Sequence, residues 1–240
     1  MKTVVLILCV GMSFCFQMNS QSKKAVIPLI GADAPSFTAE TTNGVLNFPQ
    51  DYGSSWKILL AHPKDFTPVC SSELLELSQQ QDEYAKLGAK IAVVSTDILD
   101  QHKTWVKALE EISYKDRAPV KIKFPLIADP HFIVSDKYGL IHPDASVEVN
   151  IRAVFIIDPS NKIRAINFYP LQVGRNMDEI KRTLIALETI DKQKNTAAPA
   201  NWEPGGNLMV PVLTQNEKNN IGKPESDIYQ VAWFMNFRKK

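Results

Sequence analysis

The stretch HPKDFTPVCSSE, residues 62–73, joins two segments of different periodicity and decides how this chain folds. Before it, residues 56–61 (WKILLA) form a short apolar run typical of a buried strand. After it, apolar residues recur at helical spacing. Thr67 is placed to be the helix N-cap and Pro68 the first helical residue. Cys70 therefore falls in the first turn of the predicted helix.

This position makes Cys70 the candidate reactive centre of the protein. The first turn of a helix presents unpaired backbone N–H groups and the positive end of the helix dipole. Both favour a thiolate, which is the nucleophilic form of cysteine. The alternative is a buried, inert cysteine that packs as a small hydrophobe. A dithiol oxidoreductase is excluded, because it needs Cys-x-x-Cys and Cys70 is followed by Ser-Ser-Glu.

The histidines do not by themselves indicate a protease or a metal site. A cysteine protease needs a base held by a third group, and no histidine has a local context that indicates one. No pair of His or Cys lies at the spacing of zinc ligands. We interpret the histidines as surface or satisfied core residues, with His62 as the exception; the four are His62, His102, His131 and His142.

Strands and helices alternate along the rest of the chain. Residues 90–95 predict a buried strand and residues 102–112 a helix. Residues 152–157 and 163–169 predict two strands joined by a turn-rich loop. A further helix begins at the N-cap Asn176. This order predicts an α/β domain with a mixed sheet.

The chain is expected to divide into three segments. Residues 1–20 are interpreted as a cleavable signal peptide, because Lys2 precedes an apolar run of about 14 residues and a spanning helix needs about 20. Residues 27–194 form the α/β domain. Residues 195–240 form a C-terminal arm that begins as a linker and then carries apolar clusters, which are expected to pack on another surface.

The predicted cleavage matters for the cysteine count. It would remove Cys9 and Cys15 and leave Cys70 as the single thiol, so no internal disulfide could form. A lipid anchor on Cys15 is the alternative to cleavage. The charge is balanced, with 27 Lys and Arg against 26 Asp and Glu, which excludes a net basic field for nucleic acid. We expect an exported protein, periplasmic or secreted, without stable membrane insertion.

The motif Pro63-x-x-x-Thr67-x-x-Cys70 resembles the active-site motif of the peroxiredoxins, the AhpC/TSA family. The longer string of residues 62–74 is similar to the one-cysteine, glutathione-peroxidase-like branch of that family. The resemblance continues to the C-terminus through RAVFIID (152–158), Tyr169-Pro170, Gly174-Arg175-Asn176 and Asn201-Trp202.

This resemblance implies a thioredoxin-like fold with a C-terminal dimerisation arm, assembled as a homodimer or a larger oligomer. It implies a thiol peroxidase that reduces hydrogen peroxide and organic hydroperoxides through a sulfenic acid on Cys70. No metal, haem or flavin cofactor is implied. With one thiol in the mature chain, the reductant has to be an external thiol or redox protein.

The resemblance also implies roles for individual residues. The Thr67 hydroxyl and the backbone N–H of Cys70 would hold the peroxide, and Arg152 would stabilise the thiolate and polarise the O–O bond. Pro63 would shield the pocket from water. His62 would be a supporting residue at the pocket, and Glu73 would be a supporting residue that helps link the motif to the core. Arg175 either adds a second cation near the pocket or interacts with its own helix.

Two other functions are weighed against the peroxidase. One is a redox-sensing or chaperone-like binding protein on the same scaffold. The other is a lipid hydrolase that uses Ser55, since relatives can carry Gly-x-Ser-x-Gly before the motif strand. Here that stretch is GSSWK (53–57), and Lys57 replaces the second glycine that a nucleophile elbow needs. Phospholipase activity is therefore not expected.

Overall fold

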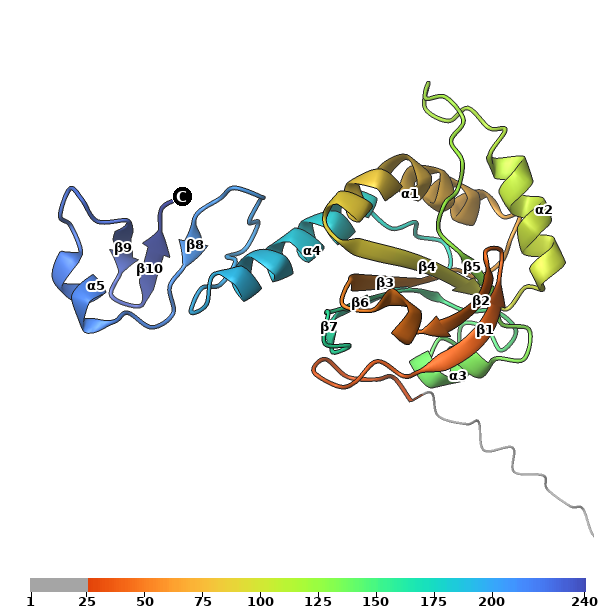
Figure 1. Ribbon diagram of the computed structural model, residues 1–240, viewed down its shortest axis with the longest axis horizontal. Helices are drawn as coiled ribbons and strands as arrows, with labels where there is room; N and C mark the ends of the chain where they lie inside the picture. The colour runs from red at the N-terminus through yellow and green to blue at the C-terminus, as the bar shows by residue number, and fades with distance from the viewer. Residues whose placement is uncertain (1–25) are drawn as a thin grey trace, which may run out of the picture.

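The computed structural model describes residues 26–240 and arranges them as a main domain and a smaller distal part, joined by one long helix (Figure 1). The main domain is a seven-stranded sheet in the order β2-β1-β5-β4-β3-β6-β7, and the distal part holds a three-stranded sheet in the order β8-β10-β9. The predicted signal peptide, residues 1–20, lies outside the described residues. Within residues 26–240, no helix is both long and apolar enough to cross a membrane.

The elements of the main domain follow one another with strands and helices interleaved. Its strands are β1 (Phe37–Thr41), β2 (Gly44–Phe48), β3 (Trp56–Ala61), β4 (Ala89–Ser95), β5 (Leu126–Ala128), β6 (Arg152–Ile157) and β7 (Ile163–Tyr169). Its helices are η1 (Gln50–Tyr52), α1 (Pro68–Lys86), α2 (Leu99–Leu109), α3 (Ile133–Tyr138) and α4 (Met177–Lys192). The distal part holds β8 (Leu208–Met209), α5 (Gln215–Asn220), β9 (Ile228–Ala232) and β10 (Met235–Arg238).

The sheet is mixed, as the order of elements predicted. β3, β4 and β5 run parallel, whereas β6 lies antiparallel to β3 and forms the predicted hairpin with β7. The antiparallel pairing aligns Ala61 with Ala153. The end of β3, where residues 62–73 begin, therefore lies beside Arg152 at the start of β6.

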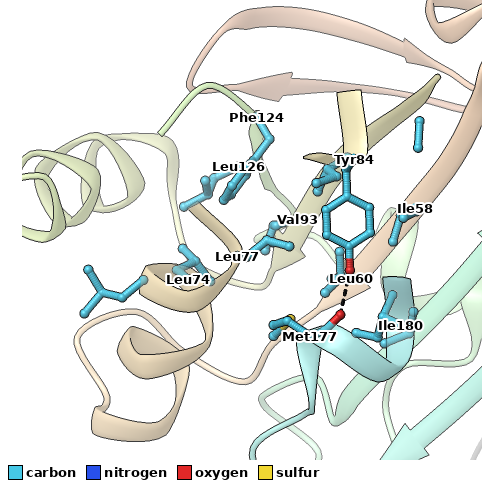
Figure 2. Packing of buried hydrophobic residues seen from close by; sticks show 14 of the residues in the cluster. Ile58, Leu60, Leu74, Leu77, Tyr84, Val93, Phe124, Leu126, Met177 and Ile180 are labelled. Carbon is cyan, nitrogen blue, oxygen red and sulfur yellow. Dashed lines mark hydrogen bonds between the residues drawn. The ribbon is translucent and has the colours of Figure 1, made fainter. Parts of the chain in front are cut away.

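Alternate side chains of each strand point to opposite faces of the sheet and form two cores. Ile58 and Leu60 join the core beneath α1, α2 and α4, while Leu59 and Ala61 join the core beneath α3. Figure 2 shows the first core, in which the Tyr84 hydroxyl of α1 donates a hydrogen bond to a backbone carbonyl at the start of α4, at 2.9 Å. This contact fixes α4 against α1, the helix that carries Cys70.

Some elements differ from the sequence-based expectation. The helix predicted at residues 102–112 is α2, which begins and ends three residues earlier, at Leu99 and Leu109. The apolar pattern placed the helix too late for two reasons. The first three residues of α2 have no buried side chain, and Ile112, which the pattern counted as part of the helix, lies beyond its end and is exposed. The β1–β2 hairpin, β5 and α3 were not predicted; β5 and α3 have three and six residues, too few to show a period.

The segment that was interpreted as a linker, residues 195–206, is partly packed. Trp202 is buried and forms a small apolar cluster with Ala186 of α4 and with Leu208. The Trp202 indole also donates a hydrogen bond to the carbonyl of Gly206, at 3.1 Å. The start of the arm is therefore attached to α4 before the distal sheet begins.

Candidate active site at the start of helix α1

Cys70 lies in the first turn of α1, as the sequence predicted, because Thr67 is the N-cap and Pro68 the first helical residue. Its side chain has no solvent exposure and belongs to the core cluster that includes Leu74 and Trp105. The backbone N–H groups of the first turn have no acceptor within the helix. The sulfur is thus held at the positive end of a 19-residue helix, beneath the surface.

Thr67 caps the helix through its backbone conformation only. Its hydroxyl makes no capping hydrogen bond to the helix; it donates to the carbonyl of Lys64, at 2.8 Å. The hydroxyl proton is thereby engaged, and the oxygen keeps lone pairs that can accept a hydrogen bond. Pro63, in the same loop, is buried.

Arg152 contacts the sulfur of Cys70 from the neighbouring strand. Its Nη1 lies 3.3 Å from Sγ and donates at 2.7 Å to the Glu73 carboxylate. Its Nε and Nη2 donate to the carbonyl of Leu171, at 3.1 and 2.8 Å. The guanidinium is therefore fixed on three sides, with one donor aimed at the thiol.

Glu73 joins Arg152 to Arg175. The Glu73 carboxylate accepts from the Arg175 backbone N–H at 2.8 Å and from its Nε and Nη2 at 2.8 and 2.7 Å. Arg175 is buried, and its Nη1 donates to the carbonyls of Ala61 and Ala153, at 2.8 and 2.7 Å. Arg175 thus binds the end of β3 and the start of β6, which flank the site. Its guanidinium makes these contacts and the contacts with Glu73, and none with α4, the helix that follows it.

Gly174 allows this approach. A Cβ at Gly174 would lie 3.3 Å from a Val69 methyl and 3.9 Å from Cγ of Glu73. A larger residue would require the Val69 side chain to shift by a few tenths of an ångström, so glycine suits this close approach to the first turn of α1.

The buried charges in this cluster do not balance without the thiol. Arg152 and Arg175 contribute two positive charges and Glu73 one negative charge, and a thiolate on Cys70 brings the sum to zero. Burial alone would raise the pKa of Glu73, but Arg175 and then Arg152 outweigh it and hold that pKa below its ordinary value. Glu73 is therefore ionised, and the remaining positive charge faces the sulfur.

Replacing Glu73 with glutamine is expected to lower the free energy of unfolding at pH 7 by about 3–5 kcal/mol, because two buried guanidinium groups lose their carboxylate. The folded-state pKa of Glu73 lies below its unfolded value. Its contribution is therefore present above the unfolded pKa and is lost as pH falls through the folded pKa. The stability difference between wild type and variant should shrink below about pH 4.3 in urea titrations.

Glu179→Gln is the matched control for this prediction. Glu179 pairs with Arg182 on the surface of α4, and its side chain is half exposed. Exposed pairs contribute about 0–1 kcal/mol. A loss at Glu73 no larger than that at Glu179 would contradict the account of the buried cluster.

A second buried network lies beside the motif. His62 Nε2 is 3.0 Å from one oxygen of Asp65, and His102 Nδ1 is 2.7 Å from the other. Burial lowers the pKa of His62, against the opposing effect of Asp65, so that ring is neutral. The sequence singled out His62 but not Asp65 or His102, whose separation of 37 residues carries no local signal.

Asp97 completes this network. It accepts from the backbone N–H of Asp65 at 2.8 Å, and it also binds the side chains of Ser95 and Gln101. Ligand atoms of His62, Asp65 and Asp97 lie within 4.8 Å of one another. All four carboxylate oxygens already accept hydrogen bonds from the protein, so the arrangement is built as a hydrogen-bond network and not as a metal cage.

The region considered for lipid hydrolysis lies at the other end of β3 from Cys70. Lys57, which replaces the glycine of the elbow, is fully buried. Its ammonium donates to the carbonyls of Gly53 and Asp158, at 2.7 and 3.3 Å. The lysine thus binds the carbonyl of Gly53, at the start of the turn that holds Ser55, whereas a nucleophile elbow needs a small residue at position 57.

Comparisons with known proteins agree on one family. The AhpC/TSA family matches residues 30–166. A peroxiredoxin of Methanosarcina mazei is 45% identical over 216 residues, which cover 89% of this chain and 98% of the relative. A peroxiredoxin of Thermotoga maritima is 38% identical over 217 residues, with coverage of 89% and 98%.

Solved structures give the same result. The peroxiredoxin 6 of Arenicola marina, as a cysteine-to-serine mutant, superposes with a TM-score of 0.76 at 31% identity, covering 88% of this chain and 97% of that one. The yeast mitochondrial 1-Cys peroxiredoxin, whose thiol resolving mechanism is described via glutathione/thioredoxin systems, has a TM-score of 0.76 at 33% identity, with coverage of 89% and 100%. The thioredoxin-like fold expected from the sequence is thereby confirmed.

Proposed function

Since this chain belongs to the AhpC/TSA family of peroxiredoxins and is a thiol-dependent peroxidase, we propose that Cys70 is the thiol that attacks the peroxide. The observation that carries this assignment is the 3.3 Å contact between Arg152 Nη1 and the Cys70 sulfur, in a buried cluster whose charges balance only with a thiolate. The family membership does not favour the sensing or chaperone-like alternative.

The reaction is a displacement at oxygen. The Cys70 thiolate attacks one oxygen of ROOH, the O–O bond breaks, and its electron pair leaves on the second oxygen, which takes up a proton to give water or an alcohol. Cys70 becomes a sulfenic acid. A first external thiol then attacks the sulfur, forms a mixed disulfide with Cys70 and releases water. A second thiol attacks the external sulfur of that mixed disulfide, which releases Cys70 as a thiol and leaves the two external thiols joined as a disulfide.

Four groups of the motif and its surroundings are proposed to lower the barrier. Negative charge develops on the leaving oxygen, and Arg152 provides a fixed cationic donor beside it. The Cys70 backbone N–H is a second donor, and the Thr67 oxygen accepts from the peroxide O–H. Pro63 limits access of water. His62, Glu73 and Arg175 are proposed as supporting residues, with Glu73 and Arg175 fixing the position of Arg152.

The reductant is proposed to be an external thiol, either a small thiol or a redox protein. Cys70 is the only cysteine of residues 26–240, so the described part of the chain contains no second thiol to resolve the sulfenic acid. The two cysteines at positions 9 and 15 lie in the predicted signal peptide. Hydrogen peroxide and organic hydroperoxides are the proposed substrates.

Mass spectrometry after one equivalent of hydroperoxide tests the assignment of Cys70. We expect the reduced protein to gain one oxygen rapidly, with the modification on Cys70, and to lose it on addition of a thiol. Hydrogen peroxide and an alkyl hydroperoxide, used in parallel, compare the two substrate classes. Oxidation no faster than that of a free cysteine would favour the sensing or binding role.

We further propose that the chain forms homodimers in which the arm, residues 195–240, packs on the partner subunit. Trp233 and Phe234, at the turn between β9 and β10, are 85% and 62% exposed, and Val231 beside them is also exposed. A cluster of large, exposed apolar side chains usually marks an interaction surface. Sedimentation analysis tests this proposal, and a monomer at micromolar concentration would contradict it.

Export to the periplasm or the cell exterior is likewise a proposal. It is supported by Lys2 and the short apolar run that follows it. N-terminal sequencing of the protein from its native source tests it. Cleavage near residue 20 would support export, a lipidated Cys15 would indicate the anchored form, and an intact N-terminus would contradict both.

A further inference from the structure

A cavity of about 320 Å³ lies at the other end of β3 from Cys70. Trp56, the first residue of β3, lines this cavity, whereas the loop that leads to Cys70 follows the last residue of the strand. The lining combines apolar and charged side chains, which include Trp56, Leu87, Pro159, Glu188, Asp191 and Lys192. The cavity is therefore separate from the candidate active site.

Two helices end at this cavity with their carbonyl groups. Leu87 is the C-cap of α1, and Asp191 and Lys192 are the last two residues of α4. The last four backbone carbonyls of a helix have no donor within it, and they give that end of the helix about half a negative charge. Both helices are long, with 19 and 16 residues. Two such ends at one cavity favour a positively charged group there.

Glu188 adds a carboxylate that the described part of the chain does not fully satisfy. The residue lines the cavity and is 8% exposed. Its Oε1 atom is buried and accepts no hydrogen bond from residues 26–240. Burial raises the pKa of Glu188, against the opposing effect of Lys192. A buried carboxylate oxygen without a donor is destabilising, and a negative charge in the last turns of a helix is unfavourable as well.

The cations that the chain itself brings to this place leave Oε1 of Glu188 without a donor. Lys192 Nζ lies 3.4 Å from Oε2, the other oxygen, and the lysine side chain is 76% exposed, so this pair contributes little. Arg164 is committed to other carboxylates. It binds both oxygens of Asp191, at 2.7 and 2.9 Å, and one oxygen of Asp158, at 3.3 Å.

The rest of the lining distinguishes between kinds of cation. A divalent metal needs several ligands held close together, and within residues 26–240 no group of three His, Cys, Asp or Glu residues at this cavity meets that condition. Trp56, Leu87 and Pro159 instead offer apolar surface. A primary alkylammonium ion matches both parts of the lining, because it has N–H donors and a positive charge at one end and an apolar chain at the other.

We propose that this cavity binds a small primary alkylammonium ion, whose N–H groups donate to Glu188 and whose alkyl chain packs on Trp56 and Leu87. The volume of the cavity is at the lower end of the range for ligand pockets, about 300–1,000 Å³, and suits a chain of a few carbons. The proposal adds a binding site to the protein and does not depend on the assignment of Cys70.

NMR titration of the nitrogen-15-labelled full chain with n-butylamine tests the proposal. At about pH 7.5 a primary amine is protonated, and the pH is well above the ordinary range of a carboxyl group. We expect saturable shifts of the Gly88 amide and of the Trp56 indole N–H, both at the cavity. The dissociation constant should be on the order of 1 mM, as suits a ligand of so few atoms.

Two comparison ligands test the chemical class. Butan-1-ol has the same chain without the charge, and magnesium chloride supplies a cation without the chain. Each is expected to bind at least about tenfold more weakly than n-butylamine. Shifts that do not saturate with n-butylamine would overturn the proposal, and so would an equal affinity for butan-1-ol or a higher affinity for magnesium.

Variants of α4 assign the binding to Glu188. Glu188→Gln keeps the size of the side chain and removes its charge, and the dissociation constant for n-butylamine should rise by at least about tenfold. Lys192→Gln removes the lysine that competes for the same carboxylate, and binding should become about two- to fivefold tighter. Glu179→Gln, at the other end of α4, is the matched control and should stay within about twofold of wild type.

An unchanged affinity in Glu188→Gln, or weaker binding in Lys192→Gln, would overturn the proposal. Melting temperatures establish that the variants are folded, and Glu188→Gln should be at least as stable as wild type because it removes a buried charge with an unsatisfied oxygen. If Glu188→Gln does not fold, Lys192→Gln and the two comparison ligands still decide. Cys70→Ser should bind n-butylamine as wild type does, and a loss of binding there would place the ligand at the wrong site.

Discussion

Replacing Cys70 with serine is expected to abolish peroxidase turnover, with peroxide consumption in the presence of excess thiol falling by at least about a thousandfold. A serine hydroxyl stays protonated where a thiol can ionise, so the nucleophile is lost. The fold should persist, because serine is close in size to cysteine and its oxygen can accept from Arg152. We expect the free energy of unfolding to change by no more than about 1–2 kcal/mol.

The chain offers a control that makes the same chemical change elsewhere. Cys15→Ser in the full chain replaces a cysteine of the predicted signal peptide and should leave turnover unchanged. Circular dichroism and urea titration of both variants establish that they are folded. Turnover retained in Cys70→Ser, or lost in Cys15→Ser, would refute the assignment of Cys70 as the nucleophile.

Replacing Arg152 with glutamine is expected to lower the rate constant for oxidation of Cys70 by about 10²–10³-fold, the usual cost of removing a donor from developing negative charge. The variant loses both the cation at 3.3 Å from the sulfur and the donor at the O–O bond. Glu73 keeps its contacts with Arg175, so the strand ends stay connected. Stopped-flow tryptophan fluorescence can follow the reaction, since Trp105 is hydrogen-bonded to the residue after Cys70.

Arg164→Gln is the matched control. Arg164 lies on β7, next to β6, and its partly buried guanidinium pairs with Asp191 and Asp158. Its loss should change the rate constant by less than about threefold. Arg152→Lys adds a second comparison, because it keeps the charge but not the planar fork, and an intermediate rate is expected. A wild-type rate in Arg152→Gln would exclude Arg152 from the reaction.

The assembly of the site shows which parts could be predicted locally. The contact between Arg152 and Cys70 joins residues 82 apart, and the contact between Arg175 and Glu73 joins residues 102 apart. Composition and periodicity carry no information on such distances, and only the family resemblance indicated Arg152. The same resemblance left two roles open for Arg175, a second cation near the pocket or a contact with its own helix. The structure shows that the Arg175 side chain binds Glu73.

The His62–Asp65–His102 chain illustrates the opposite case. The sequence treated His102 as an unremarkable core or surface histidine, because nothing within its own helix indicates a partner. The carboxylate that His102 contacts is that of Asp65, in the loop after β3. His102 itself lies on α2, which begins only after β4 and the turn that follows it. The partnership arises because parallel β3 and β4 bring both loops to the same edge of the sheet.

The sequence by itself determined the helix start, the place of Cys70 in the first turn, the β6–β7 hairpin and the N-cap of α4. Caps, proline and apolar spacing act over a few residues, so these features can be predicted from short stretches of sequence. Only the tertiary structure shows the 3.3 Å contact by which Arg152 reaches the Cys70 sulfur, a role that the family resemblance had implied, and only it shows that Glu73 binds two guanidinium groups. The physical reason is the antiparallel register of β3 and β6, which pairs Ala61 with Ala153 and sets the motif loop beside the start of β6.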